Sequence, residues 1–159
     1  MPILELKELK AQLPKGKRLM GIDHGSKTWG LAVSNSDLTI ATPLTTIKRT
    51  KFSLDIVKLA NLCKDYNIES FIIGLPLNMD GSEGPRVDSV RHFAVNLINA
   101  KDELGFEPII AFCDERLSTH SMTDVLLEHN IRHKNHKAVI DKLAAQVILQ
   151  GALDQINKF

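Results

Sequence analysis

Carboxylates at three separated places in the chain are the residues best suited to chemistry. Asp23 ends one apolar run, Asp114 and Glu115 end another, and Asp141 lies inside an apolar helical stretch. A fold that joins strand ends to a helix face would bring these acids together. Converging carboxylates repel one another unless a divalent cation neutralises them, so the pattern favours Mg²⁺ or Mn²⁺. Two such ions could stabilise the attacking and leaving oxygens of a phosphodiester, which is nuclease chemistry.

Asp141 is the most informative single residue of this set. Its helical neighbours are apolar, and a charge beside a buried stripe is costly unless it is paired. The small side chains of Ala144 and Ala145 would let this helix approach a sheet closely and bring the carboxylate near Asp23. The alternative is a structural salt bridge from Asp141 to Lys137 or Lys142.

Asp114 and Glu115 end the last predicted strand, where open α/β sheets place their ligands. Alternation along a strand puts the two side chains on opposite faces, so only one should enter a metal site, and the sequence leaves open which one. The competing interpretation is an acidic strand-to-helix turn paired with Arg116.

The stretch from Asp23 to Thr28 has the pattern Asp-x-Gly-Ser-Lys-Thr and leads into a second apolar strand. It resembles the hairpin that handles metal and phosphate in ribonuclease-H-like nucleases and actin-like ATPases. Gly21 and Gly25 would leave room for a phosphate or a second chain. Asp23 taken alone could simply be a turn residue.

The elements that must position these acids follow from apolar periodicity. Three antiparallel strands should open the sheet, with Pro43 confining the third to an edge or a bulge. Two buried parallel strands and several helices should follow, in the order β-β-β-α-β-α-β-α-α. The predicted strands cover residues 19–23, 28–34, 38–47, 71–75 and 109–113; the helices lie near 53–63, 84–98, 118–126 and 136–156, and Ser53 is a candidate N-cap.

Composition indicates one globular domain of 159 residues, 43% hydrophobic and 25% charged. Cys63 and Cys113 lie in apolar segments and predict buried reduced thiols in a cytosolic protein. No signal peptide or membrane span is expected, so the predicted location is the cytoplasm. A net charge of +1 gives no general nucleic-acid signature. Basic clusters nevertheless flank the acids: Lys15, Lys17 and Arg18; Lys48, Arg49 and Lys51; Arg132, Lys134 and Lys137.

Two further groups could bind ligands. Three histidines, His129, His133 and His136, could suggest zinc, but Asn130 should break the helix and no cysteine lies nearby, which favours a basic loop. Trp29 and Phe52 could stack on bases, although sparse aromatic residues more often pack in a core.

Four segments together resemble the YqgF family, also called RuvX or Holliday-junction-resolvase-like, from about residue 18 to the C-terminus. They read GIDHGSK from residue 21, IGLPLNMDGSEG from 73, DERLST from 114 and DKLAAQVILQ from 141. The family usually has a basic residue after Lys27, where this chain has Thr28 and Trp29. A contact to the nucleic-acid backbone would then be missing or supplied elsewhere.

The resemblance implies a ribonuclease-H-like domain over 18–159, with 1–17 as an N-terminal extension and a mixed five-stranded sheet. It implies a nuclease of 5′-end maturation of pre-16S rRNA, which would bind structured or single-stranded pre-rRNA or ribosomal assembly intermediates. Asp23, Glu115 or Asp114, and Asp141 would form the catalytic set, with Asp23, Glu115 and Asp141 holding Mg²⁺ or Mn²⁺. The candidates for positioning phosphates are Lys27, Asn78, Arg86 and Arg116.

Three other functions compete with this one. A Holliday-junction resolvase would need a dimer to cut two strands symmetrically, and the sequence shows no dimer face. An actin-like ATPase or kinase closes a nucleotide between two domains, and this chain holds one. A non-catalytic RNA-binding assembly factor would keep the acids for structure, and metal-dependent cleavage would exclude it.

Overall fold

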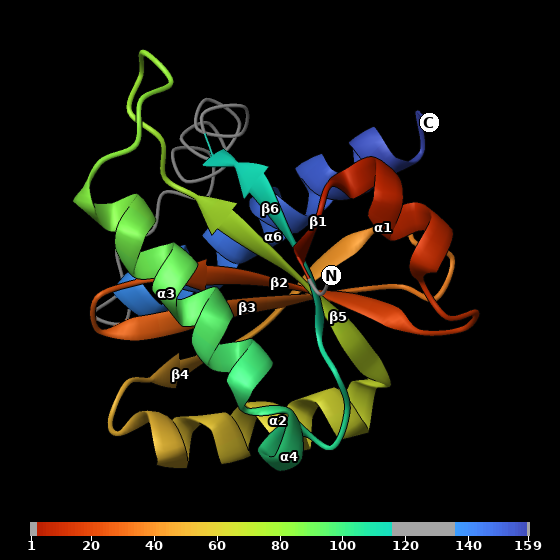
Figure 1. Cartoon of the computed structure of the whole chain (residues 1–159), viewed down its shortest axis with the longest axis horizontal. Helices are drawn as coiled ribbons and strands as arrows, with labels where there is room; N and C mark the ends of the chain where they lie inside the picture. Colours follow the sequence, from red (N-terminus) through yellow and green to blue (C-terminus); the bar gives the residue numbers. More distant parts are fainter. Residues whose placement is uncertain (1–2, 116–135, 159) are drawn as a thin grey trace.

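The computed structural model describes residues 3–115 and 136–158, with side chains of the last helix described from residue 140. A single mixed sheet forms its centre, with helices on both faces (Figure 1). The elements are β1 (Ile3–Leu4), α1 (Leu6–Gln12), β2 (Arg18–His24), β3 (Thr28–Ser34), β4 (Ala41–Lys48), α2 (Phe52–Tyr66), β5 (Ile68–Leu75), α3 (Pro85–Asn99), α4 (Lys101–Leu104), β6 (Ile109–Asp114) and α6 (His136–Ile156).

The strand order is β1-β6-β5-β2-β3-β4. The predicted antiparallel meander β2-β3-β4 is confirmed, and β5 and β6 run parallel to β2 as expected. Pro43 lies on the edge strand β4, opposite a register shift between Leu31 and Ala32. This is the ribonuclease-H-like arrangement that the resemblance implied. The difference is a sixth, two-residue strand, β1, which pairs with β6 because the N-terminal residues lie along that edge.

Helices cover the sheet as two separate layers (Figure 1). On one face, α2, α3 and α4 pack over side chains such as Met20, Phe71 and Ile73. On the other face, α1 and α6 pack over Leu19 and Ile72. The central strands are buried on both sides, which explains why residues 71–75 of β5 are a continuous apolar run rather than an alternating one.

Glycines in the strands, together with alanines, allow α6 to lie close to the sheet. A Cβ on Gly21 would stand 2.7 Å from the Leu149 Cβ and 2.9 Å from the Ala145 carbonyl oxygen. A Cβ on Gly30 would overlap the Asp141 carbonyl oxygen. The prediction that Gly21 leaves room for a phosphate is therefore wrong, because α6 fills that space. Close approach by α6 was expected from Ala144 and Ala145, and Ala145 is fully buried in this interface.

Two glutamines fix α6 along the edge strand β4. The Gln150 Oε1 accepts a hydrogen bond from the Ala41 N–H at 2.9 Å, and the Gln146 Nε2 donates to the Ala41 carbonyl at 3.2 Å. The Gln150 Nε2 also donates to the Thr39 carbonyl at 3.0 Å. An edge strand has unpaired backbone groups, and these bonds satisfy some of them while setting the position of the helix.

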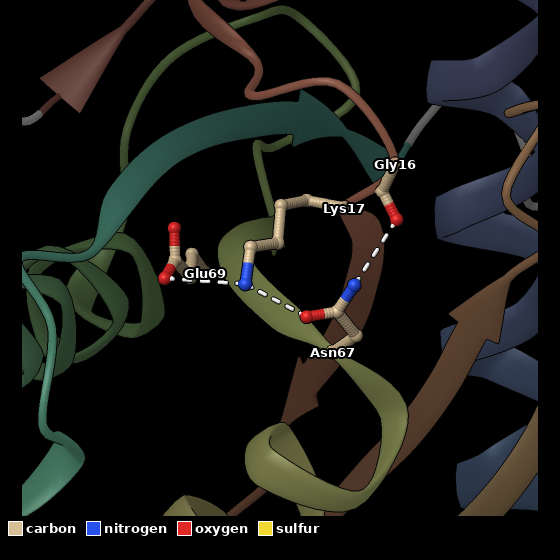
Figure 2. A network of polar contacts seen from close by, with 4 residues as sticks. All are labelled: Gly16, Lys17, Asn67 and Glu69. Atoms are coloured by element: carbon tan, nitrogen blue, oxygen red, sulfur yellow. Dashed lines mark hydrogen bonds and ion pairs between the residues drawn. The ribbon is translucent and has the colours of Figure 1, made fainter.

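A polar network ties β2 to β5 where both strands begin (Figure 2). Asn67, with φ 61° and ψ 52°, ends α2 in the left-handed conformation that asparagine tolerates. Its amide accepts from the Lys17 Nζ at 2.7 Å and donates to the Gly16 carbonyl at 3.2 Å. Lys17 also pairs with Glu69 at 3.4 Å. The network holds the two strands in register, so that their far ends can meet at a common site.

The start of α2 differs from the prediction. Lys51, rather than Ser53, is the N-cap, and its side chain makes no capping bond. The buried carboxylate of Asp55 instead accepts from the Thr50 N–H at 2.8 Å and the Thr50 hydroxyl at 2.7 Å, which orders the chain entering the helix. Ser53 therefore falls within the first turn.

The N-terminal residues pack on the domain: β1 extends the sheet, and Leu9 of α1 is fully buried among residues of α6 and β6. The division of the chain near residue 17 stays a prediction. Cys63 and Cys113 are buried free thiols, as expected, and burial raises their pKa values to about 12 and about 11. Among the described residues, no helix is long and apolar enough to cross a membrane.

Candidate functional site

Four elements bring charged side chains to one place beyond the carboxyl ends of β2, β5 and β6. Asp23 lies near the end of β2, Glu115 directly follows β6, Asp141 belongs to the early part of α6, and Arg86 to the first turn of α3. The electrostatic coupling among these four groups shows that they share one site. The predicted meeting of strand ends with a helix face is thus present, at the sheet edge where α/β folds bind ligands.

Asp23 and Glu115 form the centre of this site and are hydrogen-bonded to each other. Burial is the main cause that raises the pKa of Asp23 to about 6, and the charge of Asp141 raises it further. Burial also raises the pKa of Glu115 to about 7, with the charge of Asp23 as the second cause. Arg86 opposes both shifts, because its positive charge favours the ionised carboxylates. These raised pKa values bring the ionisation of the pair close to neutral pH.

Asp141 is held by a hydrogen bond that the sequence did not predict. The Thr28 hydroxyl, at the start of β3, donates to the Asp141 Oδ2. Among the described ion pairs, none joins Asp141 to Lys142, and the Lys137 side chain lies outside the described residues. Thr28, where the resemblance implied a basic residue, thus supplies the donor that orients this carboxylate.

Of the two acids at the end of β6, Glu115 is the one that turns toward Asp23. Its carboxylate meets Asp23 and packs beside Gly74 of β5, where a Cβ would stand 2.5 Å from the Glu115 Oε1. Asp114 is the last residue of β6 and acts on Glu115 through its charge, which raises the pKa of Glu115. The absence of a side chain at Gly74 is what gives Glu115 its space.

The four predicted phosphate-positioning residues fall in different places. Arg86 joins the acids. Asn78 lies in the loop between β5 and α3, where its Nδ2 donates to the Ser82 hydroxyl at 3.0 Å. Lys27 is exposed in the turn between β2 and β3. Arg116 lies outside the described residues, as do the segment 118–126, His129 and His133.

Arg49 also organises the site, although the sequence marked it only as part of a basic cluster. Its guanidinium donates to the Gly25 carbonyl at 2.8 Å and the Ser26 carbonyl at 3.2 Å, so it braces the turn that follows Asp23. Burial, with the nearby charge of Arg49, lowers the pKa of His24 to about 4. His24 is therefore neutral at pH 7 and packs its ring 4.5 Å from that of Phe93.

Glu115→Gln tests the raised carboxyl pKa. Between pH 4.5 and 7, folded Glu115 keeps a proton that the unfolded chain has lost, so its ionisation costs stability as pH rises through that window. His24 acts in the opposite sense between pH 4 and 6.5, because only the unfolded chain is protonated there. The unfolding free energy of Glu115→Gln, relative to wild type, should therefore increase between pH 5 and 8, since His24 contributes equally to both proteins.

Urea denaturation at a series of pH values measures this difference. Glu107→Gln is the matched control, because it makes the same change at a side chain that is 86% exposed. A constant difference for Glu115→Gln would show that Glu115 ionises normally.

The oxygen donors at this site fit a divalent cation chemically, since Mg²⁺ and Mn²⁺ prefer carboxylates. As the side chains lie, no group of three or more His, Cys, Asp or Glu within the described ranges is set to hold a metal. In this arrangement Asp23 and Glu115 are hydrogen-bonded to each other, and the Asp141 Oδ2 accepts a hydrogen bond from the Thr28 hydroxyl. A cation could replace the proton as the group that relieves the carboxylate repulsion.

Comparison with known proteins gives a consistent result. Residues 17–155 match the family model described as "RuvX: Holliday junction resolvase". A protein of Rhodospirillum centenum named "Putative pre-16S rRNA nuclease" is 49% identical over 99% of this chain and 84% of its own length. A protein of the same name from Paramagnetospirillum magneticum is 48% identical over 100% of this chain and 99% of its own. Among solved structures, T. thermophilus RuvC in complex with a Holliday junction substrate aligns with a TM-score of 0.49 and 13% identity, over 83% of this chain and 91% of that one.

Proposed function

Because the chain belongs to the RuvX family, we propose that it is a phosphodiester-cleaving nuclease that processes pre-16S rRNA. The observation that carries this proposal is the convergence of Asp23, Glu115 and Asp141 beside Arg86 at the carboxyl edge of the sheet. Two buried carboxyl groups with raised pKa values, Asp23 and Glu115, beside one cationic side chain are typical of a catalytic site rather than a structural ion pair. The relatives named as pre-16S rRNA nucleases support the choice of substrate.

We assign Asp23, Glu115 and Asp141 as the ligands of one or two Mg²⁺ or Mn²⁺ ions. Bound there, such ions would supply the positive charge that stabilises the attacking and leaving oxygens of the phosphodiester. Asp23 is central, because it interacts with both other acids. Thr28 keeps the Asp141 carboxylate turned toward the site, and Glu115 must release its proton before it can ligate an ion.

Substrate positioning falls to residues around the acids. Arg86 is placed to neutralise a phosphate, and it stands in the first turn of α3, where backbone N–H groups also favour anions. Lys27 and Asn78 occupy the two adjoining loops and could contact flanking phosphates. Asp114 and Arg116 stay predictions, as second acid and further phosphate contact.

A cleavage assay with two substrates tests the proposal. Purified protein is incubated with a pre-16S rRNA fragment that includes the 5′ leader, or with a four-way DNA junction, each with Mn²⁺ or with EDTA. We expect Mn²⁺-dependent cleavage of the RNA. Cleavage of the junction alone would establish a resolvase instead. RNA binding without cleavage would establish an assembly factor.

Divalent cations should stabilise the protein in the absence of substrate. They relieve repulsion among acids that burial already destabilises, so the unfolding free energy should increase by ~1–3 kcal/mol when metal is in large excess over its Kd. Urea denaturation with and without millimolar Mn²⁺ measures the gain. Asp23→Asn should lose most of it. An unfolding curve that Mn²⁺ does not move would contradict the ligand assignment.

A further inference from the structure

A pocket of about 250 Å³ opens on the face of the sheet covered by α2 and α3, at the end of β2 where Asp23 also lies. We name it the Trp29 pocket. Its lining includes Trp29, His24, Arg49, Phe52, Phe93 and Asn96. His24 is the neighbour of Asp23 in β2, and it pairs with Trp29 across to β3. The side chains of His24 and Asp23 therefore leave opposite faces of the sheet at its carboxyl edge, and the pocket lies across that edge from the acids. Since a liquid water molecule takes up roughly 30 Å³, the pocket has room for one flat ring system.

Aromatic rings form much of the pocket wall. The Trp29 ring lies 4.9 Å from that of Phe93 and 6.0 Å from that of Phe52, and the His24 ring lies 4.5 Å from Phe93. Trp29 and Phe93 are buried behind His24 and Phe52, which are half-buried, so the ring surface that a ligand could reach belongs to His24 and Phe52. Clustered rings at the edge of a nucleic-acid site are the surfaces on which unpaired bases stack.

The polar groups of the wall point to a ligand that both accepts and donates hydrogen bonds. Trp29 is 1% exposed, and its indole N–H has no hydrogen-bond partner within the described part of the chain. A buried donor without an acceptor is rare and costs free energy. The carboxylate of Asp55, also 1% exposed, lines the same pocket, and each of its oxygens has capacity for a second bond. A nucleobase carries donors and acceptors on one flat edge, whereas an apolar ligand would leave the indole N–H of Trp29 unsatisfied.

Charge at the pocket favours a nucleotide over a free base. The Arg49 guanidinium lines the pocket while it holds the turn after Asp23, so the pocket wall carries a positive charge at that turn. A phosphate that joins a base in the pocket to the scissile bond would pass this group.

We infer that the Trp29 pocket binds the base of the nucleotide next to the scissile phosphodiester, with Arg49 on its phosphate. This inference rests on the proposed nuclease function for its position in the reaction. The binding itself can be tested without cleavage. It also gives Trp29 a role beyond the core packing that its burial shows.

The chain contains a single tryptophan, so its fluorescence reports on this pocket alone. The full chain in EDTA is titrated with AMP, UMP or ribose 5-phosphate. We expect saturable changes in Trp29 emission with the nucleotides and none with ribose 5-phosphate. A response to ribose 5-phosphate equal to that of the nucleotides would reveal an anion site and overturn the assignment to a base. No response to any of the three would overturn it as well.

Asn96→Phe fills the pocket, and Asn99→Phe makes the same change on the same helix at an exposed position outside it. Asn96→Phe should weaken nucleotide binding about tenfold or more, and Asn99→Phe less than about twofold. Ser89→Leu, at an exposed position that also lines the pocket, gives a second block if Asn96→Phe fails to fold. Equal binding by both Asn→Phe variants would refute the pocket.

The experiments distinguish failure of the nuclease proposal from failure of the base-site inference. Suppose that the protein cleaves no RNA and still shows nucleotide-dependent Trp29 emission that is lost in Asn96→Phe. The base site would then stand, and only its position beside a scissile bond would be refuted. If the protein cleaves RNA but nucleotides do not change Trp29 emission, the nuclease assignment stands and the inference of a base site is refuted.

Discussion

Asp23→Asn should reduce Mn²⁺-dependent cleavage by roughly 10³-fold or more, because it removes the acid that interacts with both Glu115 and Asp141. The same change should leave the metal-free protein at least as stable as wild type at pH 8. Ionised Asp23 is destabilised by burial and by Asp141, and its raised pKa means that ionisation above about pH 6 costs folding free energy. Asparagine keeps the shape and removes that cost.

The two measurements are single-turnover cleavage and urea denaturation in EDTA. Asp37→Asn, an exposed change in the turn between β3 and β4, is the control and should affect neither. A variant that loses activity and also unfolds would indicate that Asp23 is structural. Near-normal cleavage by a stable Asp23→Asn would contradict the catalytic assignment itself.

The sequence predicted the sheet well because its signals are local. Residues close together in the chain are enough to predict antiparallel strands joined by short turns. They are also enough to predict a buried strand from a single apolar run. Strand β3 and helix α6 begin and end where periodicity placed them. The pairing of β1 with β6 was missed, because a two-residue strand has no periodicity and forms only where the rest of the fold supplies an edge.

The acids were found from the sequence, but not the groups that arrange them. Thr28 looked like a departure from the family pattern, and only the contact between β3 and α6 shows that it orients Asp141. The choice between Asp114 and Glu115 depends on Gly74 in the adjacent strand, a contact between residues far apart in the chain. From the sequence, Ala144 and Ala145 of α6 were expected to allow the helix to lie close to the sheet. In the structure the closest contacts with α6 are made by Gly21 and Gly30 in the strands.

The close contact between the strand glycines and α6 predicts a large loss of stability when Gly30 is enlarged. In Gly30→Ala the new methyl group would overlap the Asp141 carbonyl oxygen, which is helix backbone and cannot rotate away as a flexible side chain would. Either β3 or α6 must move, and overpacking of this kind costs about 3 kcal/mol. Urea denaturation measures the loss. Gly151→Ala is the matched control, because nothing lies within 4 Å of its Cβ position, and it should stabilise α6 by roughly 0.5–1 kcal/mol.

Gly30→Ala also separates the position of Asp141 from its charge. If α6 shifts away from β3, the Asp141 carboxylate remains in the protein but loses its bond to Thr28 and its nearness to Asp23. The pKa of Asp23 should then fall, and cleavage should drop even at temperatures where the variant is fully folded. A folded Gly30→Ala with wild-type activity would mean that the close contact between α6 and the sheet serves packing alone, and that catalysis does not depend on where Asp141 stands.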